Sequence, residues 1–203
     1  MQGECPSNRR AEELHRAVKD TYRLVAAKAD GRFPYPVGRA SALGLGYEAE
    51  WLDAAPADVT ARFVGVGNPF AVGRPTSGER VLDVGCGCGL DVFVAGHLAG
   101  RDGRSVGIDI TPEMLELPRR LLGTGPLDNL EFLEADVESL PFDDGTFDRV
   151  ISNGALNLVP DKDRALREIH RVLRAGGTFA TADLLVTETV PASVLEDMDA
   201  WST

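Results

Sequence analysis

Three glycines spaced two residues apart form the most informative motif of this chain. Residues 80–90 read Arg-Val-Leu-Asp-Val-Gly-Cys-Gly-Cys-Gly-Leu, which places Gly85, Gly87 and Gly89 between a short apolar run and an apolar helical pattern. A strand, a glycine turn and a helix in this order let a ligand approach the backbone at the start of the helix. The motif therefore predicts a nucleotide site. The alternative is a tight turn that binds nothing.

Two details of the turn favour S-adenosylmethionine over a dinucleotide as the ligand. The dinucleotide fingerprint needs a third glycine at the position where this chain has Leu90. Asp83 stands just before the turn, where a carboxylate would repel a pyrophosphate but attract the ammonium and sulfonium of S-adenosylmethionine. We expect Asp83 and the three glycines to bind the methionine end of the cofactor, with Cys86 beside them. A nicotinamide-dependent oxidoreductase is the alternative that these two residues disfavour.

A second acidic residue follows at the end of the next expected strand. Residues 104–110 read Arg-Ser-Val-Gly-Ile-Asp-Ile, and Asp109 lies about 20 residues beyond the last glycine. A carboxylate there can accept hydrogen bonds from the ribose hydroxyls, while Ile110 offers the adenine an apolar surface. Thr111 and Pro112 are typical of a helix start, with a hydroxyl cap and a proline in the first turn. Met114 on this helix is a further expected cofactor contact.

Two later strands deliver polar residues to the same edge. The strand expected at residues 130–134 leads to Asp136, placed to accept from the adenine amino group, with Val137 at the ring edge. The strand expected at residues 147–151 leads to Asn153, which we expect to be a further cofactor contact. In a parallel sheet, ligands lie outside the carboxyl ends of the strands. The separate signals therefore converge on one pocket.

The order of the elements predicts the fold class. A helix at about residues 161–173 would end at Gly176 and Gly177, and a fifth strand would run over residues 178–185. Strands that alternate with helices predict an α/β fold with a doubly wound, mostly parallel, Rossmann-like sheet. Residues 76–203 would form this core.

The motifs of the core resemble the class I S-adenosylmethionine-dependent methyltransferases. The matching segments are Val-Leu-Asp-Val-Gly-Cys-Gly-Cys-Gly, Gly-Ile-Asp-Ile-Thr-Pro-Glu-Met-Leu, Glu-Ala-Asp-Val-Glu-Ser-Leu-Pro-Phe and Phe-Asp-Arg-Val-Ile-Ser-Asn. The Thr-Pro-Glu-Met-Leu segment, the run that starts at Ile151 and Gly-Val-Gly-Asn-Pro-Phe from Gly65 resemble the arsenite methyltransferase branch more narrowly. The resemblance implies methyl transfer from S-adenosylmethionine to a small-molecule acceptor. It also implies that Asn153, Gly154 and Asn157 face the substrate.

The chain departs from that branch at its arsenic ligands. Arsenite methyltransferases bind trivalent arsenic through cysteine thiolates, whereas this chain has Val66 and Gly154 at two matching positions and stops before a third. A soft metalloid requires soft thiolate ligands. We therefore expect an acceptor other than arsenite. Two alternatives stay open, a cofactor-binding protein that is catalytically incomplete and a true arsenite methyltransferase.

The remaining cysteines and the histidines predict no metal site. Cys86 and Cys88 form a Cys-X-Cys pair without a second pair or a nearby histidine to complete a zinc site. The three histidines, at positions 15, 97 and 170, fall on expected helices without a visible partner that would make one a general base.

Composition limits the class of partner. The chain has 203 residues and a net charge of −11, which disfavours nucleic acid and anionic membranes as partners. There is no apolar run of membrane-spanning length and no signal peptide pattern. Three unpatterned cysteines fit a reducing cytoplasm, so we expect a cytoplasmic protein.

Residues 1–75 precede the core and predict a helical cap that contributes to the substrate pocket. An amphipathic helix is expected at residues 9–29, an extended segment at 33–39, and short helices at 47–52 and 56–63. Tyr35, Tyr47 and Phe70 are candidates to line the pocket or, equally, to be packing aromatics.

The C-terminal end predicts an open sheet edge. After the fifth strand only one helix is expected, at residues 191–201, so the two last strands usual in the resembling family are apparently missing, either because the sheet is naturally short or because this is a piece of a longer chain. An uncovered fifth strand could pair with a second copy in a homodimer.

Overall fold

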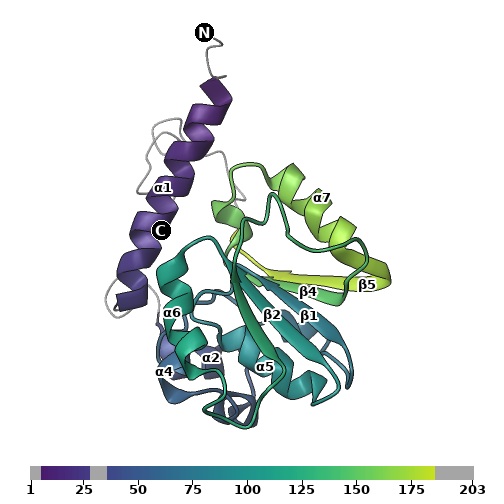
Figure 1. Cartoon of the computed structure of the whole chain (residues 1–203). Coiled ribbons are helices and arrows are strands. Elements are labelled where there is room, and N and C mark those ends of the chain that lie inside the picture. Colours follow the sequence, from purple (N-terminus) through teal and green to yellow (C-terminus); the bar gives the residue numbers. More distant parts are fainter. Residues whose placement is uncertain (1–5, 28–35, 186–203) are drawn as a thin grey trace.

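The fold is built on a parallel sheet of five strands (Figure 1). The computed structural model describes residues 6–27 and 36–185. The strands have the order β3-β2-β1-β4-β5 and every neighbouring pair is parallel. Their bounds are β1 Arg80–Val84, β2 Arg104–Asp109, β3 Leu130–Glu134, β4 Phe147–Asn153 and β5 Leu173–Ala182. The predicted α/β class is confirmed, and the strand order reverses direction between β1 and β4.

Helices cover both faces of this sheet. Helices α5 (Leu90–Ala99) and α6 (Pro112–Leu121) share one apolar cluster with Val81 and Ile151. Helix α7 (Lys162–Val172) shares another with Leu82 and Val150. Successive residues of a strand point to opposite faces, so β1 contributes to both clusters. Asp83 comes two residues after Val81 and therefore points to the α5 side, among otherwise buried apolar residues.

The fifth strand corrects a prediction. Strand β5 begins at Leu173, directly after α7, and ends at Ala182, so both predicted bounds were wrong. Gly176 and Gly177 do not end the helix; they lie within the strand, where the pairing with β4 shifts register between Phe147 and Arg149. Glycines favour such bulges, and a Cβ on Gly177 would lie 2.9 Å from the Asp148 carbonyl oxygen.

The segment before the sheet is helical, as predicted, but with different bounds. Its short elements are α2 Gly38–Gly44, α3 Ala49–Asp53, α4 Ala57–Thr60 and the 3-10 turn η1 Pro69–Val72; a second such turn, η2 Leu156–Leu158, follows β4. Helix α2 replaces the end of the predicted extended segment. It begins at Gly38, whose N–H donates to the Phe63 carbonyl oxygen at 2.7 Å. The cluster that contains α5 also contains Trp51, Leu52 and Val59.

Helix α1 (Pro6–Ala27) is the long amphipathic helix that the sequence predicted. Leu14, Val18 and Val25 are buried, and the helix contacts α6, beside which it stands in Figure 1. The last two residues of the predicted helix, 28 and 29, lie outside the described residues. This arrangement brings one side of α1 to the carboxyl ends of the strands.

Strand β5 occupies one edge of the described sheet. Residues 186–203, which include the helix predicted at 191–201, lie outside the described part of the chain. Pairing of a second copy with this edge stays a prediction. Within residues 6–27 and 36–185, none of the helices combines the length and the apolar character that crossing a membrane requires.

Candidate functional site

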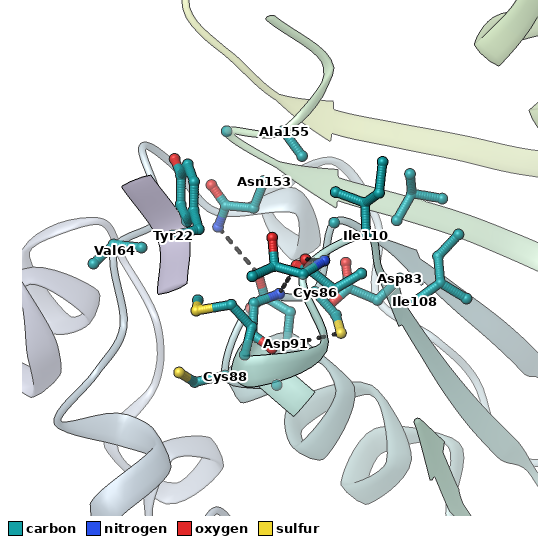
Figure 2. A pocket seen from close by; sticks show the side chains of 18 of the residues that line it. Tyr22, Val64, Asp83, Cys86, Cys88, Asp91, Ile108, Ile110, Asn153 and Ala155 are labelled. Carbon is teal, nitrogen blue, oxygen red and sulfur yellow. Dashed lines mark hydrogen bonds between the residues drawn. The ribbon is translucent and has the colours of Figure 1, made fainter. Parts of the chain in front are cut away.

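A cavity lies at the carboxyl ends of the strands, where the strand order reverses (Figure 2). Open sheets of this kind bind ligands at this position. Its lining combines the glycine turn, the ends of β1, β2 and β4, the segment after β3, and residues of α1 and of the linker before η1. The predicted site residues on its surface are Asp83, Gly85, Cys86, Gly87, Gly89, Asp109, Ile110, Met114, Asp136, Val137, Asn153 and Gly154.

The glycine turn requires residues without a side chain. Gly85 has φ +70°, and a Cβ there would lie 2.2 Å from the Cβ of Ala155. Gly89 has φ +90°, caps the N-terminus of α5, and would bring a Cβ to 2.6 Å from the Phe132 ring. Both the left-handed backbone and the close approach exclude larger residues. The turn thus presents bare backbone to the cavity at the start of a helix.

Asp109 fastens the glycine turn to the end of β2. One carboxylate oxygen accepts from the N–H of Gly87 at 2.9 Å, and the other accepts from the N–H of Thr111 at 2.8 Å. Burial raises the pKa of Asp109, and these backbone hydrogen bonds oppose that rise. The predicted hydroxyl cap is wrong, because the Thr111 side chain makes no capping hydrogen bond. Each Asp109 oxygen can accept more than one hydrogen bond, so the carboxylate can still take a ribose hydroxyl.

Asp83 is a buried carboxylate without a protein partner. Its side chain is 1% exposed, and neither carboxylate oxygen has a hydrogen-bond partner among the described residues. Burial raises the pKa of Asp83 well above its usual value, and the charges of Asp91 and Asp109 raise it further. Such a group is costly unless a ligand supplies the missing cation or donor. Asp83 therefore fits a cationic ligand group in the cavity.

A buried hydrogen-bond network, missed in the sequence, lies beside Asp83. Asp91, in the first turn of α5, accepts from the Tyr47 hydroxyl at 2.6 Å and from the Asn153 amide nitrogen at 3.1 Å. Burial raises the pKa of Asp91 to about 6, against the effect of these two hydrogen bonds. The sequence signal for Asp91 was an acidic residue inside the apolar run that follows the glycines. The same pattern is also typical of an acidic residue in the first turn of any helix, so it did not indicate a buried network.

The side chain of Asn153 is held by the protein. Its oxygen accepts from the N–H groups of Val66 at 2.9 Å and Gly67 at 3.2 Å, and its nitrogen also donates to Tyr47 Oη at 3.0 Å and to the Gly67 carbonyl oxygen at 2.9 Å. Asn153 lines the cavity, but its amide joins the end of β4 to the linker. Its predicted contact with the cofactor stays a prediction.

The two cysteines of the turn are buried thiols. Burial raises the pKa of Cys86 well above its usual value and the pKa of Cys88 to about 11. Cys88 packs with Met114 and with Val25 of α1. Both cysteines are therefore protonated at neutral pH, which makes them poor nucleophiles and poor metal ligands.

Polar groups of α1 and of the segment after β3 meet at one end of the cavity. Asp136 accepts from the N–H of Glu138 at 2.9 Å, and His15 of α1 lies 3.9 Å from an Asp136 oxygen and 3.6 Å from a Glu138 oxygen. Ile110 and Val137 line the same end. The assignment of this end to the adenine stays a prediction.

Of the two predicted substrate residues that the structure describes, Gly154 lines the cavity and Asn157 does not. The third, Tyr35, lies outside the described residues. The backbone N–H of Asn157 donates to Asp183 Oδ2 at 3.2 Å. Tyr47 and Phe70 are buried, form an edge-to-face pair and do not line the cavity, so their packing alternative holds.

Comparison with known proteins identifies the family. A sequence model of the methyltransferase domain matches residues 75–203. The chain belongs to the class I S-adenosylmethionine-dependent methyltransferases, whose methyl donor is S-adenosylmethionine. Within that class it lies near the arsenite methyltransferase branch.

Three relatives illustrate this position. An arsenite methyltransferase of Halobacterium salinarum is 39% identical over 156 residues, covering 77% of this chain and 40% of the relative. A ubiquinone/menaquinone biosynthesis C-methyltransferase of Hahella chejuensis is 45% identical over 102 residues, covering 50% of this chain and 41% of the relative. The crystal structure of an arsenic(III) S-adenosylmethionine methyltransferase from Chlamydomonas reinhardtii superimposes with a TM-score of 0.66 at 37% identity, covering 71% of this chain and 51% of that one. The chain thus spans about two fifths of the length of these two curated relatives.

Proposed function

We propose that this chain binds S-adenosylmethionine in the cavity and transfers its methyl group to a small organic acceptor other than arsenite. The unpartnered carboxylate of Asp83, next to a bare-backbone turn, is the observation that carries the proposal. The methionine end of the cofactor bears an ammonium, which supplies the cation that Asp83 lacks. Membership of the methyltransferase family supports the same ligand.

Other residues fit the rest of the cofactor. Asp109 would accept from the ribose hydroxyls while it holds the glycine turn in place. Ile110, Val137 and Asp136 would take the adenine, with Cys86 and Met114 in contact with the cofactor beside the turn. Helix α1 would cover this end through His15, which lies 3.6 Å from a Glu138 oxygen.

Methyl transfer depends on how the acceptor is positioned more than on a general acid or base. S-adenosylmethionine supplies a methyl group on a sulfonium, from which an acceptor nucleophile takes it by in-line displacement. The chain must hold the acceptor in line with this group and exclude water. Helix α1 and the linker before η1 supply the cover for this purpose, so we propose residues 1–75 as the cap of the acceptor pocket.

The cap side of the cavity favours an apolar acceptor. Its lining there is mostly apolar, with Val59 of α4 and Phe63 and Val64 of the linker before η1, and Arg62 among them. No thiolate faces this region within the described residues, because the only described cysteines are the buried, protonated Cys86 and Cys88. Apolar surroundings suit a small organic molecule, not a soft metalloid.

Arsenite is the second candidate acceptor, and one spatial relation favours it. A Cβ on Gly154 would lie 3.4 Å from both γ-carbons of Val66. The resemblance implies that arsenite methyltransferases carry cysteines at these two positions, and in this chain the two positions lie side by side. Relatives named arsenite methyltransferases support this alternative.

Calorimetric titration with S-adenosylhomocysteine tests the cofactor, with NAD as a parallel control. We expect micromolar binding of S-adenosylhomocysteine and none of NAD. Turnover of S-adenosylmethionine with a panel of thiol, amine, hydroxyl and carbon acceptors, with arsenite included, then tests the acceptor. Cofactor binding without turnover of any acceptor would favour the catalytically incomplete alternative, and NAD binding alone would exclude the proposal.

A further inference from the structure

Asp91 connects the cap to the sheet at the wall of the cavity. It lies in the first turn of α5, is 5% exposed and lines the cavity. Its Oδ1 accepts from the Tyr47 hydroxyl, and its Oδ2 accepts from the Asn153 amide nitrogen. Figure 2 shows the hydrogen bond between Asn153 and Asp91. Each carboxylate oxygen can accept a further hydrogen bond, so Asp91 can be held by the protein and still face a ligand.

The Tyr47 hydroxyl is a permanent donor to Asp91. Their hydrogen bond of 2.6 Å is the shortest of the network, while Tyr47 Oη also accepts from Asn153 at 3.0 Å. Burial and the charge of Asp91 raise the pKa of Tyr47 well above its usual value, so the hydroxyl keeps its proton at neutral pH. Edge-to-face contacts with Phe63 and Phe70 hold the ring separately. Removing the hydroxyl alone therefore leaves the ring packing in place.

Tyr47 acts on the cavity from outside it. The residue lies between α2 and α3, is 3% exposed and does not belong to the cavity lining. The negative charges of both Asp91 and Asp83 nevertheless act on its hydroxyl, which places Tyr47 close to the two carboxylates beside the glycine turn. Any effect of the hydroxyl on a ligand therefore passes through Asp91, to which it donates.

Asp83 and Asp91 are two buried carboxylates that disfavour each other's charge. Burial raises the pKa of both, and the charge of Asp91 raises that of Asp83 further. Asp83 has no hydrogen-bond partner among the described residues, whereas the donors Tyr47 and Asn153 oppose the rise in the pKa of Asp91. Hydrogen bonds to the charged form favour it. The Tyr47 hydroxyl therefore favours a negative charge on Asp91, in the wall of the cavity.

We propose that Tyr47 is a positioning residue for cofactor binding, whose hydroxyl keeps the Asp91 carboxylate charged and fixed in the cavity wall, where it attracts the cofactor's ammonium. This inference rests on the proposed function. A charge attracts an opposite charge more strongly in a buried site than in water. Tyr47 belongs to the cap, so the cap would contribute to cofactor binding as well as to the acceptor pocket.

Calorimetry with Tyr47→Phe tests the inference, because this variant keeps the ring and loses the hydroxyl. The ligands are S-adenosylhomocysteine and 5′-methylthioadenosine, a thioether of the same nucleoside without the amino-acid group. At pH 7 the variant should bind S-adenosylhomocysteine about 3- to 10-fold more weakly than the unsubstituted chain, because part of Asp91 is then protonated. Affinity for 5′-methylthioadenosine, which has no ammonium, should equal that of the unsubstituted chain.

The pH profile distinguishes this effect from looser packing. Without the hydroxyl, the pKa of Asp91 rises above about 6, so its carboxylate becomes charged at higher pH. The loss of affinity in Tyr47→Phe should therefore be largest near pH 7 and shrink to within about twofold at pH 8.5. Among the described residues, the titratable groups that face Asp91 are Tyr47 and Asp83, and Asp109 acts on Asp83. Both of these acids are present in each protein, so the difference between the two profiles reports on Asp91.

Thr60→Val is the matched control. Thr60 is another buried hydroxyl of the cap outside the cavity lining, and it donates to the Pro56 carbonyl oxygen at 3.3 Å. Its loss should change neither affinity nor the pH profile.

A double-mutant cycle provides a second variant if Tyr47→Phe alone fails to fold. In an Asp91→Asn background, Tyr47→Phe should cause no further loss of affinity for S-adenosylhomocysteine, because the charge that it supports is already absent. Equal losses for both ligands, a loss that does not change with pH, or a further loss in the Asp91→Asn background would overturn the inference. Failure of the unsubstituted chain to bind S-adenosylhomocysteine would instead overturn the proposed function.

Discussion

At the scale of single residues, Asp83 combines a cost in stability with a use in binding. A buried carboxyl with a raised pKa stabilises the fold while it is protonated, and this contribution is lost as pH rises through the raised pKa. Proteins keep such groups where function needs them. The carboxylate that attracts the cofactor's ammonium is therefore expected to destabilise the free protein.

Asp83→Asn should uncouple these two effects. At pH 8 we expect the variant to unfold about 2–4 °C above the unsubstituted chain, because burial penalises the ionised form of Asp83 and a neutral amide does not carry that penalty. The difference should shrink as pH falls toward 4, where both side chains are uncharged. Affinity for S-adenosylhomocysteine should fall at the same time. Thermal unfolding across pH checks the stability and calorimetry checks the affinity. If the difference in unfolding temperature between Asp83→Asn and the unsubstituted chain is smaller at pH 8 than at pH 5, this explanation is contradicted.

The raised pKa of Asp91 leads us to expect that cofactor binding depends on pH. Its pKa of about 6 in the free protein means that the carboxylate loses its charge as pH falls below 6. Since the ammonium of the ligand prefers the charged form, affinity for S-adenosylhomocysteine should be about tenfold weaker at pH 5 than at pH 7.5. Asp91→Asn should reduce this dependence, and the part that remains belongs to Asp83, whose pKa is also raised. An unchanged pH profile in that variant would assign the titration to another group.

Asp109→Ala should weaken binding of S-adenosylhomocysteine by about 1–3 kcal/mol, the range for hydrogen bonds to a charged group. The same substitution frees the N–H of Gly87, so part of the loss would come from a looser turn. Asp148, an acid with ion-pair and backbone partners outside the cavity, provides a control in Asp148→Ala. Unchanged affinity in Asp109→Ala would refute the ribose assignment.

Site residues at a fixed spacing from the glycines could be predicted from the sequence. Site residues whose hydrogen-bond partners lie far away along the chain were missed. Asp83 and Asp109 could be predicted because each follows a short apolar strand at a fixed distance from the glycines. Asp91 could not, because its partners Tyr47 and Asn153 lie 44 and 62 positions away.

At the scale of elements, the glycine turn is the part least tolerant of side chains. Gly85→Ala combines a left-handed backbone with a 2.2 Å approach to Ala155. Gly123 has a similar φ of +73° but no atom within 4 Å of its ideal Cβ position, so Gly123→Ala isolates the backbone effect. We expect Gly85→Ala to cost roughly 1–3 kcal/mol more in unfolding free energy. Equal costs in chemical denaturation would show that the close approach is unimportant.

The elements also show where local patterns mislead. The strands of the core were predicted within a few residues because each is a short apolar run between turns. Strand β5 was placed too late because two adjacent glycines are typical of a helix end, whereas here they form a bulge within a strand. Helix α2 was missed because prolines before it indicated an extended chain. In both cases a distant backbone contact decides the conformation, and local sequence does not contain it.

At the scale of the whole molecule, α1 should respond to the cofactor. Val18 and Tyr22 line the cavity, and His15 bridges to the segment after β3. Cofactor binding adds contacts to this face, so S-adenosylhomocysteine should slow amide hydrogen exchange in residues 14–25. Exchange in α7, which packs on the opposite face of the sheet, serves as the internal control. Equal exchange in α1 with and without ligand would remove it from the cofactor site.

The bond between Asn153 and the linker has a consequence for how acceptor preference can diverge. The amide oxygen of Asn153 accepts from the main chain at Val66 and Gly67, not from a side chain. These two hydrogen bonds therefore do not depend on the side chain at position 66. A substitution between cysteine and valine at this position would change the chemistry of the pocket surface from a thiol to an apolar group, while the backbone of the linker keeps its conformation.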